Sequence, residues 1–154
     1  MRDFGAADKR KKQGRIGVRE NPAGLSDEAL SGLASKVKAS LHEGNLPCGS
    51  AFKISRDSGI PRIAVGEMAD RLGVRITNCQ IGCFKVDKII HDNAGSEAVD
   101  ESVLSMLQDL RDKQALTCSK VFELAASLKM TPMAVASVAN GRNLKVHACQ
   151  LGCF

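Results

Sequence analysis

Apolar side chains recur at the spacing of an amphipathic helix in two long stretches of the chain. The first stretch begins at Ser26, a favourable N-cap, and runs to about Gly44. The second runs from about Glu97 to Gln114. The positions expected to face a core are Leu30, Leu33, Ala34, Val37 and Leu41 in the first stretch and Val99, Val103, Met106, Leu107 and Leu110 in the second. Each stretch therefore predicts one leading helix.

Each leading helix precedes two shorter helical segments joined by a tight turn. In the first case, Cys48 opens a helix that Gly59 ends, and a second helix runs from Arg62 to Leu72. Pro61 fits the first turn of this second helix, where its missing N–H costs nothing. Thr131-Pro132 repeats the feature as N-cap and first helical residue.

Alternating apolar and polar residues follow the second short helix in both cases. Gly73 to Asn78 predicts a strand, Cys79 to Cys83 a turn, and Phe84 to Ile90 a returning strand that completes a β-hairpin. Near the end of the chain, Asn143 to His147 predicts a strand whose returning partner is missing. An exposed strand edge at that point would invite pairing with a second copy or a protein partner.

The two series of elements are copies of one sequence unit. Leu46 to Phe84 aligns with Leu116 to Phe154 without a gap, at a constant offset of 70 residues (118 − 48 = 70). The leading helices need an offset of 73 (100 − 27 = 73). Identical pairs at the offset of 70 include Cys48/Cys118, Cys79/Cys149, Cys83/Cys153, Leu46/Leu116, Val65/Val135, Gly82/Gly152 and Phe84/Phe154. We predict an arm at 1–25, a first repeat at 26–92 and a second repeat at 93–154.

The turn between the two short helices resembles that of the helix-turn-helix family. A small residue is followed four positions later by a turn residue, then directly by an apolar residue, and five positions later by another apolar residue. These residues are Ser55, Gly59, Ile60 and Val65 in the first repeat and Ala125, Lys129, Met130 and Val135 in the second. The strand and turn that follow are similar to the winged-helix variant. The resemblance implies a mainly α-helical fold of two tandem helix-turn-helix (winged-helix-like) repeats, each ending in a short β-strand or hairpin, and a DNA-binding function.

Composition and charge change this picture little. The chain has 44% hydrophobic and 25% charged residues, and no apolar run approaches the ~18 residues that would span a bilayer. The amino terminus lacks an apolar stretch with a cleavage site, which predicts a cytoplasmic protein without a membrane partner. The formal net charge is +5, and residues 1–20 hold +4 of it (7 basic minus 3 acidic residues). Such an arm can follow a phosphate backbone or simply keep a protein soluble.

By the resemblance to the helix-turn-helix family, the second short helix of each repeat is the recognition helix, which enters the major groove of DNA. Polar residues on and after these two helices are the candidate DNA contacts. The positions expected to be exposed are Pro61, Arg62, Gly66, Glu67 and Asp70 in the first repeat and Pro132, Met133, Ser137 and Asn140 in the second. Arg62 suits guanine and Asn140 suits adenine, whereas Glu67 would face a polyanion. The full candidate set is Arg62, Glu67, Arg71, Arg75, Ser137, Asn140, Arg142 and Lys145. Two helix-turn-helix repeats on one chain would occupy adjacent half-sites of double-stranded DNA.

The repeated cysteines are the candidate metal or redox site. Each repeat places one cysteine at a helix start and two in a Cys-x-x-x-Cys turn, and such triads can donate three sulfurs to zinc or an iron–sulfur cluster. The two triads are Cys48, Cys79 and Cys83, and Cys118, Cys149 and Cys153. A fourth ligand would be needed, and His147 offers one in the second repeat only. A redox switch that uses the helix-start thiols, and plain burial as small apolar residues, are the alternatives.

Catalysis has the least support of the function classes. The chain has three histidines, no glycine-rich phosphate loop and no carboxylate pair that recurs with the repeat, so we predict a protein that is not an enzyme. The sequence predicts a sequence-specific DNA-binding protein, a transcriptional regulator with a thiol- or metal-responsive cysteine site. The alternative is a non-enzymatic protein-interaction or metal-binding module with a duplicated helical fold and structural cysteines.

Overall fold

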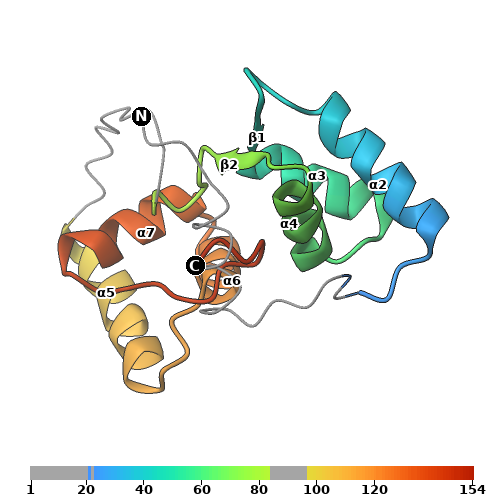
Figure 1. Cartoon of the computed structure of the whole chain (residues 1–154). Coiled ribbons are helices and arrows are strands. Elements are labelled where there is room, and N and C mark those ends of the chain that lie inside the picture. The colour runs from blue at the N-terminus through green and yellow to red at the C-terminus, as the bar shows by residue number, and fades with distance from the viewer. Residues whose placement is uncertain (1–20, 22, 84–96) are drawn as a thin grey trace. The chain divides into compact units, whose positions relative to one another are not determined.

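The computed structural model describes residues 21, 23–83 and 97–154, and these residues are mainly helical, as the sequence predicts (Figure 1). They contain six helices and a sheet of two short strands. Contacts divide the chain into two compact units. Unit 1 holds the residues up to Cys79 together with Gln150–Phe154, and unit 2 holds Gln80–Cys149. The predicted arm up to residue 20, the returning strand at 84–90 and the repeat boundary at 92/93 lie outside the described residues.

Unit 1 begins with the predicted leading helix, α2 (Asp27–Ala39), whose N-cap Ser26 accepts a hydrogen bond from the Ala29 amide at 3.3 Å. The predicted end near Gly44 is wrong, because α2 ends at Ala39 and the chain then reverses at Glu43 and Gly44. His42 and Asn45 exchange backbone hydrogen bonds of 2.8 and 2.9 Å across a two-residue turn. Both turn residues have positive φ, which a helix does not allow.

Unit 1 contains a strand pairing that the sequence does not predict, beside the predicted strand after the second short helix. Strand β1 (Asn45–Pro47) precedes α3 and pairs in parallel with β2 (Arg75–Thr77), with Leu46 opposite Ile76 (Figure 1). The sequence places Leu46 and Pro47 at the entry of a helix and does not predict this strand. A strand of three residues carries too short an alternation to be recognised, and its partner lies about 30 residues away.

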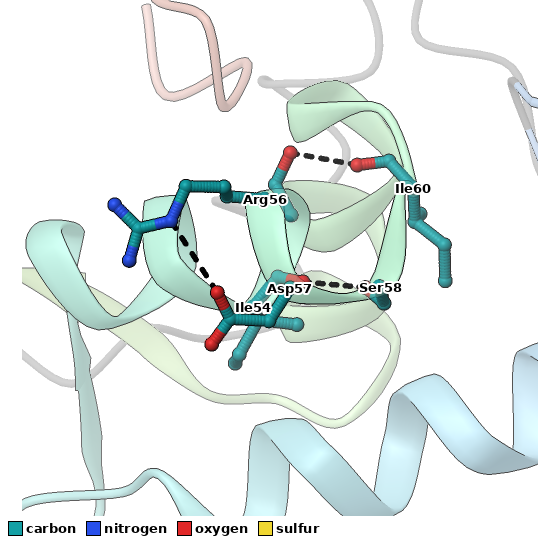
Figure 2. A network of polar contacts seen from close by, with 6 residues as sticks. Ile54, Arg56, Asp57, Ser58 and Ile60 are labelled. Atoms are coloured by element: carbon teal, nitrogen blue, oxygen red, sulfur yellow. Dashed lines mark hydrogen bonds and ion pairs between the residues drawn. The ribbon is translucent and has the colours of Figure 1, made fainter.

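Helices α3 (Cys48–Ser58) and α4 (Arg62–Arg71) of unit 1 are joined by the predicted tight turn, and Figure 2 shows its polar contacts. The Ser55 hydroxyl donates to the Ile60 carbonyl at 2.7 Å, and the Ser58 hydroxyl donates to the Ile54 carbonyl. Gly59 caps α3 with a φ of 65°, the left-handed conformation that glycine adopts without steric cost. Pro61 is the N-cap of α4 and so lies one residue before the helix.

Unit 2 repeats this arrangement in α5 (Glu97–Asp112), α6 (Cys118–Ser127) and α7 (Pro132–Gly141). Thr131 is the predicted N-cap of α7, and its hydroxyl accepts from the Ala134 amide at 3.2 Å. Lys129 has a φ of 54° at the position equivalent to Gly59. The turn closes through a hydrogen bond of 2.9 Å from the Met130 amide to the Ala125 carbonyl.

The predicted strand from Asn143 to His147 is reduced to one parallel bridge between His147 and Thr117. This bridge is the counterpart of Pro47 opposite Thr77 at the offset of 70. The duplication therefore extends to backbone pairing, although unit 2 forms only its last step. The sequence predicts an exposed strand edge here that would pair with a second copy. Residues 97–154 form an isolated bridge but no strand, so this edge is not found within them.

The cores of the two units use equivalent residues. Leu46 and Leu116 are 0% and 1% exposed, and Val65 and Val135 are both 0% exposed. In the leading helices, Leu33, Val37, Val103 and Leu107 are buried, whereas Leu30, Ala34, Leu41 and Leu110 are half-buried. Met106 is 41% exposed, so its predicted core position is wrong. The side chain of Val99 lies outside the described part of the chain.

No single helix in the described residues is long and apolar enough to cross a membrane. Helices α6 and α7 reach that length and composition only when taken together, and the chain bends by 117° between them.

Candidate functional site

The sequence Cys-Gln-x-Gly-Cys occurs twice, at 79–83 and 149–153, and the chain passes from one unit to the other within each copy of this motif. The first passage falls between Cys79 and Gln80 and the second between Cys149 and Gln150, again 70 residues apart. The turn of the first repeat therefore belongs to unit 2, and the last five residues of the second repeat belong to unit 1, so the two repeats exchange motifs. The apolar residue at the centre of each motif, Ile81 or Leu151, is 1% exposed and is a core residue of the unit that receives it.

In unit 1, the C-terminal segment (Gln150–Phe154) packs on the face of α4 that carries Arg62 and Gly66, which we name the α4 docking face. The Arg62 guanidinium donates a hydrogen bond to the side-chain oxygen of Gln150. The same guanidinium lies 3.9 Å from the centre of the Phe52 ring, within the range of a cation–π contact. Arg62 is therefore half-buried and is held from two sides.

Gly66 sits directly beneath the backbone of Leu151. A Cβ atom added to Gly66 would overlap with the Leu151 carbonyl oxygen and carbon, and a backbone group cannot turn aside as a flexible side chain can. Gly66 is buried, so its predicted exposure on a DNA-reading surface is wrong. A glycine inside a helix is unfavourable by about 0.5–1 kcal/mol relative to alanine, and the close approach of the segment gives it a structural reason.

In unit 2, the turn of the first repeat (Gln80–Cys83) packs on α7. A Cβ atom added to Gly82 would lie 3.0 Å from the Met133 sulfur and 4.0 Å from the Asn140 side-chain nitrogen. Ala136, the counterpart of Gly66, is 1% exposed. Met133 and Pro132 are half-buried, whereas Ser137 and Asn140 remain exposed as predicted.

The eight candidate DNA contacts fall into two groups by unit. Unit 1 contains Arg62, Glu67 and Arg75, which are half-buried, and Arg71, which is exposed. Unit 2 contains Ser137, Asn140, Arg142 and Lys145, which are all exposed. The exposed candidates are thus gathered mainly on and after α7.

Glu67, the acidic residue that counts against DNA binding, forms an ion pair with Arg71 one helical turn later. The nitrogen–oxygen distance is 3.4 Å, and the Glu67 side chain is 11% exposed. The pair offsets the repulsion that Glu67 would exert on a phosphate. It also commits part of the Arg71 guanidinium, because one donor then points along the helix.

The division between the two units runs through each predicted cysteine triad. Cys48 and Cys79 belong to unit 1 and Cys83 to unit 2, and the second triad is divided in the same way, with Cys153 in unit 1. Among the residues described, no group of three or more His, Cys, Asp or Glu side chains has an arrangement that could hold a metal ion. The geometry thus gives no support to the two predicted triads, and zinc or cluster binding stays a prediction.

The redox alternative requires thiols at helix starts that reagents can reach. The structure places the two thiols at helix starts but buries them. Cys48 and Cys118 are the first residues of α3 and α6, where the helix dipole favours a thiolate. They are only 6% and 4% exposed. The amide of Cys118 donates to the His147 carbonyl at 3.0 Å, which ties this helix start to the parallel bridge. Cys83 is the exposed thiol, and Cys149 and Cys153 are half-buried.

Comparison with protein-family models, with curated proteins and with solved structures gave no match.

Sequence reasoning missed the docking of the motif on α4 and α7. Two signals were present in the chain. An apolar residue stands between glutamine and glycine in both motifs, and Gly66 lies inside a predicted helix. The first signal indicates that the motif is buried, and the second indicates a packing reason for the glycine. Neither names the partner, because the motif packs on the copy from which it does not come.

Proposed function

We propose that the protein is a non-enzymatic, sequence-specific DNA-binding protein of the helix-turn-helix type. The observation that carries this proposal is the geometry of α6 and α7, which turn through 117° across the four-residue connection 128–131. Helix-turn-helix pairs cross at about 90–120° with a turn of three to four residues. In unit 1, the connection 59–61 between α3 and α4 has three residues and includes Gly59.

The exposed polar residues of unit 2 fit this function. Asn140 suits the paired donor and acceptor of adenine in the major groove, and Ser137 can contact either kind of base. Arg142 follows the last residue of α7, and Lys145 lies three residues further, where cations can contact phosphates. In this proposal α7 is the reading helix and the residues after it fix its position on the duplex.

The test is selection from a library of random duplexes, followed by affinity measurements on the enriched sequence across a range of salt concentrations. Asn140→Ala should weaken binding by about 1–3 kcal/mol and relax the preference at one base pair. Arg142→Ala should weaken binding to all sequences alike and lower the salt slope by about one.

Lys113→Ala is the matched control, because it removes one exposed cation of unit 2 that lies after α5 and outside the proposed surface. It should leave the sequence preference unchanged. A library from which no sequence is enriched would overturn the proposal.

A protein-interaction module is the second candidate, and one observation favours it. The α4 docking face already holds a peptide segment through a buried leucine and a side-chain hydrogen bond. Charge reversal by Arg62→Glu, together with removal of residues 1–20, separates the two functions. If DNA affinity survives both changes, it does not come from the first repeat, and the interaction module is favoured for that half of the chain.

A further inference from the structure

Two residues of α4 that the sequence places on the DNA-reading surface, Arg62 and Gly66, contact the C-terminal segment. The side chain predicted to address guanine, Arg62, donates to Gln150. Gly66, which the sequence places on an exposed surface, lies under the Leu151 carbonyl. A duplex that lies against this face would have to occupy the space of Gln150 and Leu151.

The contact has the features of specific docking. Leu151 is 1% exposed, so it is buried as completely as the core residues of unit 1. The polar side chain before it is met by Arg62, and Arg62 is in turn stacked on Phe52. A side chain at position 66 would prevent the approach, and this position holds a glycine.

The equivalent face of α7 differs in a way that matters for function. Position 136 holds alanine instead of glycine, and position 132 holds proline where α4 has Arg62. Ser137 and Asn140 stay exposed beside the docked turn. The polar reading residues of α7 are therefore accessible, while the guanidinium of α4 is committed.

We propose that the α4 docking face is a binding site for the chain's own C-terminal segment, Gln150–Phe154, and that this segment and duplex DNA compete for it. The competition rests on the proposed DNA-binding function, whereas the docking does not. While the segment is bound, only the second repeat reads DNA. Release of the segment adds Arg62 and the first repeat to the contact.

The docking is tested on the full chain with Gly66→Ala and with Gly32→Ala as the control. Gly32 lies in the exposed part of α2, and a Cβ atom added there meets nothing within 4 Å. Carboxypeptidase digestion followed by mass spectrometry measures how often the segment leaves α4, from the rate at which Leu151 and Gln150 are removed, because cleavage tracks the population of the open state. If the open state is at most about 10% populated in the unaltered chain, a substitution that makes it the main state raises its population by about tenfold or more. Gly66→Ala should therefore accelerate their removal by that factor, and Gly32→Ala should leave the rate unchanged.

Gln150→Ala is the second variant, because it weakens the segment without altering α4. It should also accelerate digestion. Equal digestion rates for the unaltered chain, Gly66→Ala and Gln150→Ala would overturn the docking.

DNA affinity for the selected duplex separates the two parts of the proposal. If the segment competes, both variants should bind more tightly, by up to about tenfold for a competent state that is about 10% populated. Faster digestion with unchanged affinity would overturn the competition alone. Faster digestion in a chain that selects no duplex would overturn the proposed function and leave the docking intact.

Discussion

At the scale of single residues, burial separates the six cysteines into groups that sequence position does not reveal. Cys48, Cys79 and Cys118 are at most 6% exposed. Cys83 is exposed, although its counterpart Cys153 is half-buried. The repeat therefore preserves the identity of the residue without preserving its accessibility.

We predict a corresponding order of thiol reactivity. Cys83 should be alkylated first, and the three buried cysteines should react at least about a hundredfold more slowly. A local opening that costs about 3 kcal/mol is enough to slow the reaction by this factor. Timed alkylation followed by peptide mass spectrometry measures this order. The control is the same reaction in denaturant, where all six should react alike. Rapid reaction of Cys48 or Cys118 in the folded protein would contradict the buried arrangement and favour the redox site.

At the scale of elements, local sequence predicted what depends on neighbouring residues. The N-caps Ser26 and Thr131, the glycine cap of α3 and the start of α4 at Arg62 all follow from residue types within one helical turn. Strand β1 could not be predicted, because its only support is the parallel partner β2 and a segment of three residues has no period of its own. The predicted end of α2 is wrong for a different reason. Leu41 continues the apolar stripe, but the helix already ends at Ala39, ahead of the chain reversal at Glu43 and Gly44.

The two helix-connecting turns offer a matched prediction. A Cβ atom added at Gly59 would meet nothing within 4 Å, so Gly59→Ala tests backbone conformation alone. It should lower the free energy of unfolding by about 1 kcal/mol, since the left-handed conformation costs a non-glycine residue about 1–2 kcal/mol. Lys129 already bears this cost at a φ of 54°, so Lys129→Gly should leave stability unchanged or raise it by up to about 1 kcal/mol.

Denaturant unfolding measures both changes. The sign is the informative result, because Gly59→Ala should lower stability whereas Lys129→Gly should not. A loss of stability in Lys129→Gly as large as that in Gly59→Ala would show that the lysine side chain, and not the backbone, stabilises the second turn.

At the scale of the whole molecule, the sequence predicted the duplication but not the exchange of motifs between the repeats. Periodicity and an offset of 70 are enough to identify two copies. Which copy receives each motif depends on packing at Gly66, Met133 and Asn140, and these contacts join residues about 50 to 90 positions apart. For the same reason, the predicted cysteine triads assumed that each motif packs on its own copy.

The exchange predicts that core substitutions act across the repeats. Leu151→Ala should destabilise unit 1 by about 2–5 kcal/mol, the usual cost of truncating a buried leucine, although Leu151 belongs to the second repeat. Hydrogen exchange should then accelerate in α4 before α7. Ile81→Ala should give the reverse order, with α7 affected first. Acceleration confined to the repeat that carries the substitution would contradict the exchange.

The positions of the two motifs have a consequence for how the sequence can change over time. Each motif packs on a helix of the other repeat, so a substitution in the motif changes the packing of that helix. The residues that each motif can carry therefore depend on the other repeat. Two copies that had simply been joined in tandem would be free to diverge independently. Here a substitution at Leu151 requires a compensating substitution in α4, and a substitution at Gly82 requires one in α7. The partner of each motif is inherited on the same chain, which keeps the two halves of the duplication matched to each other.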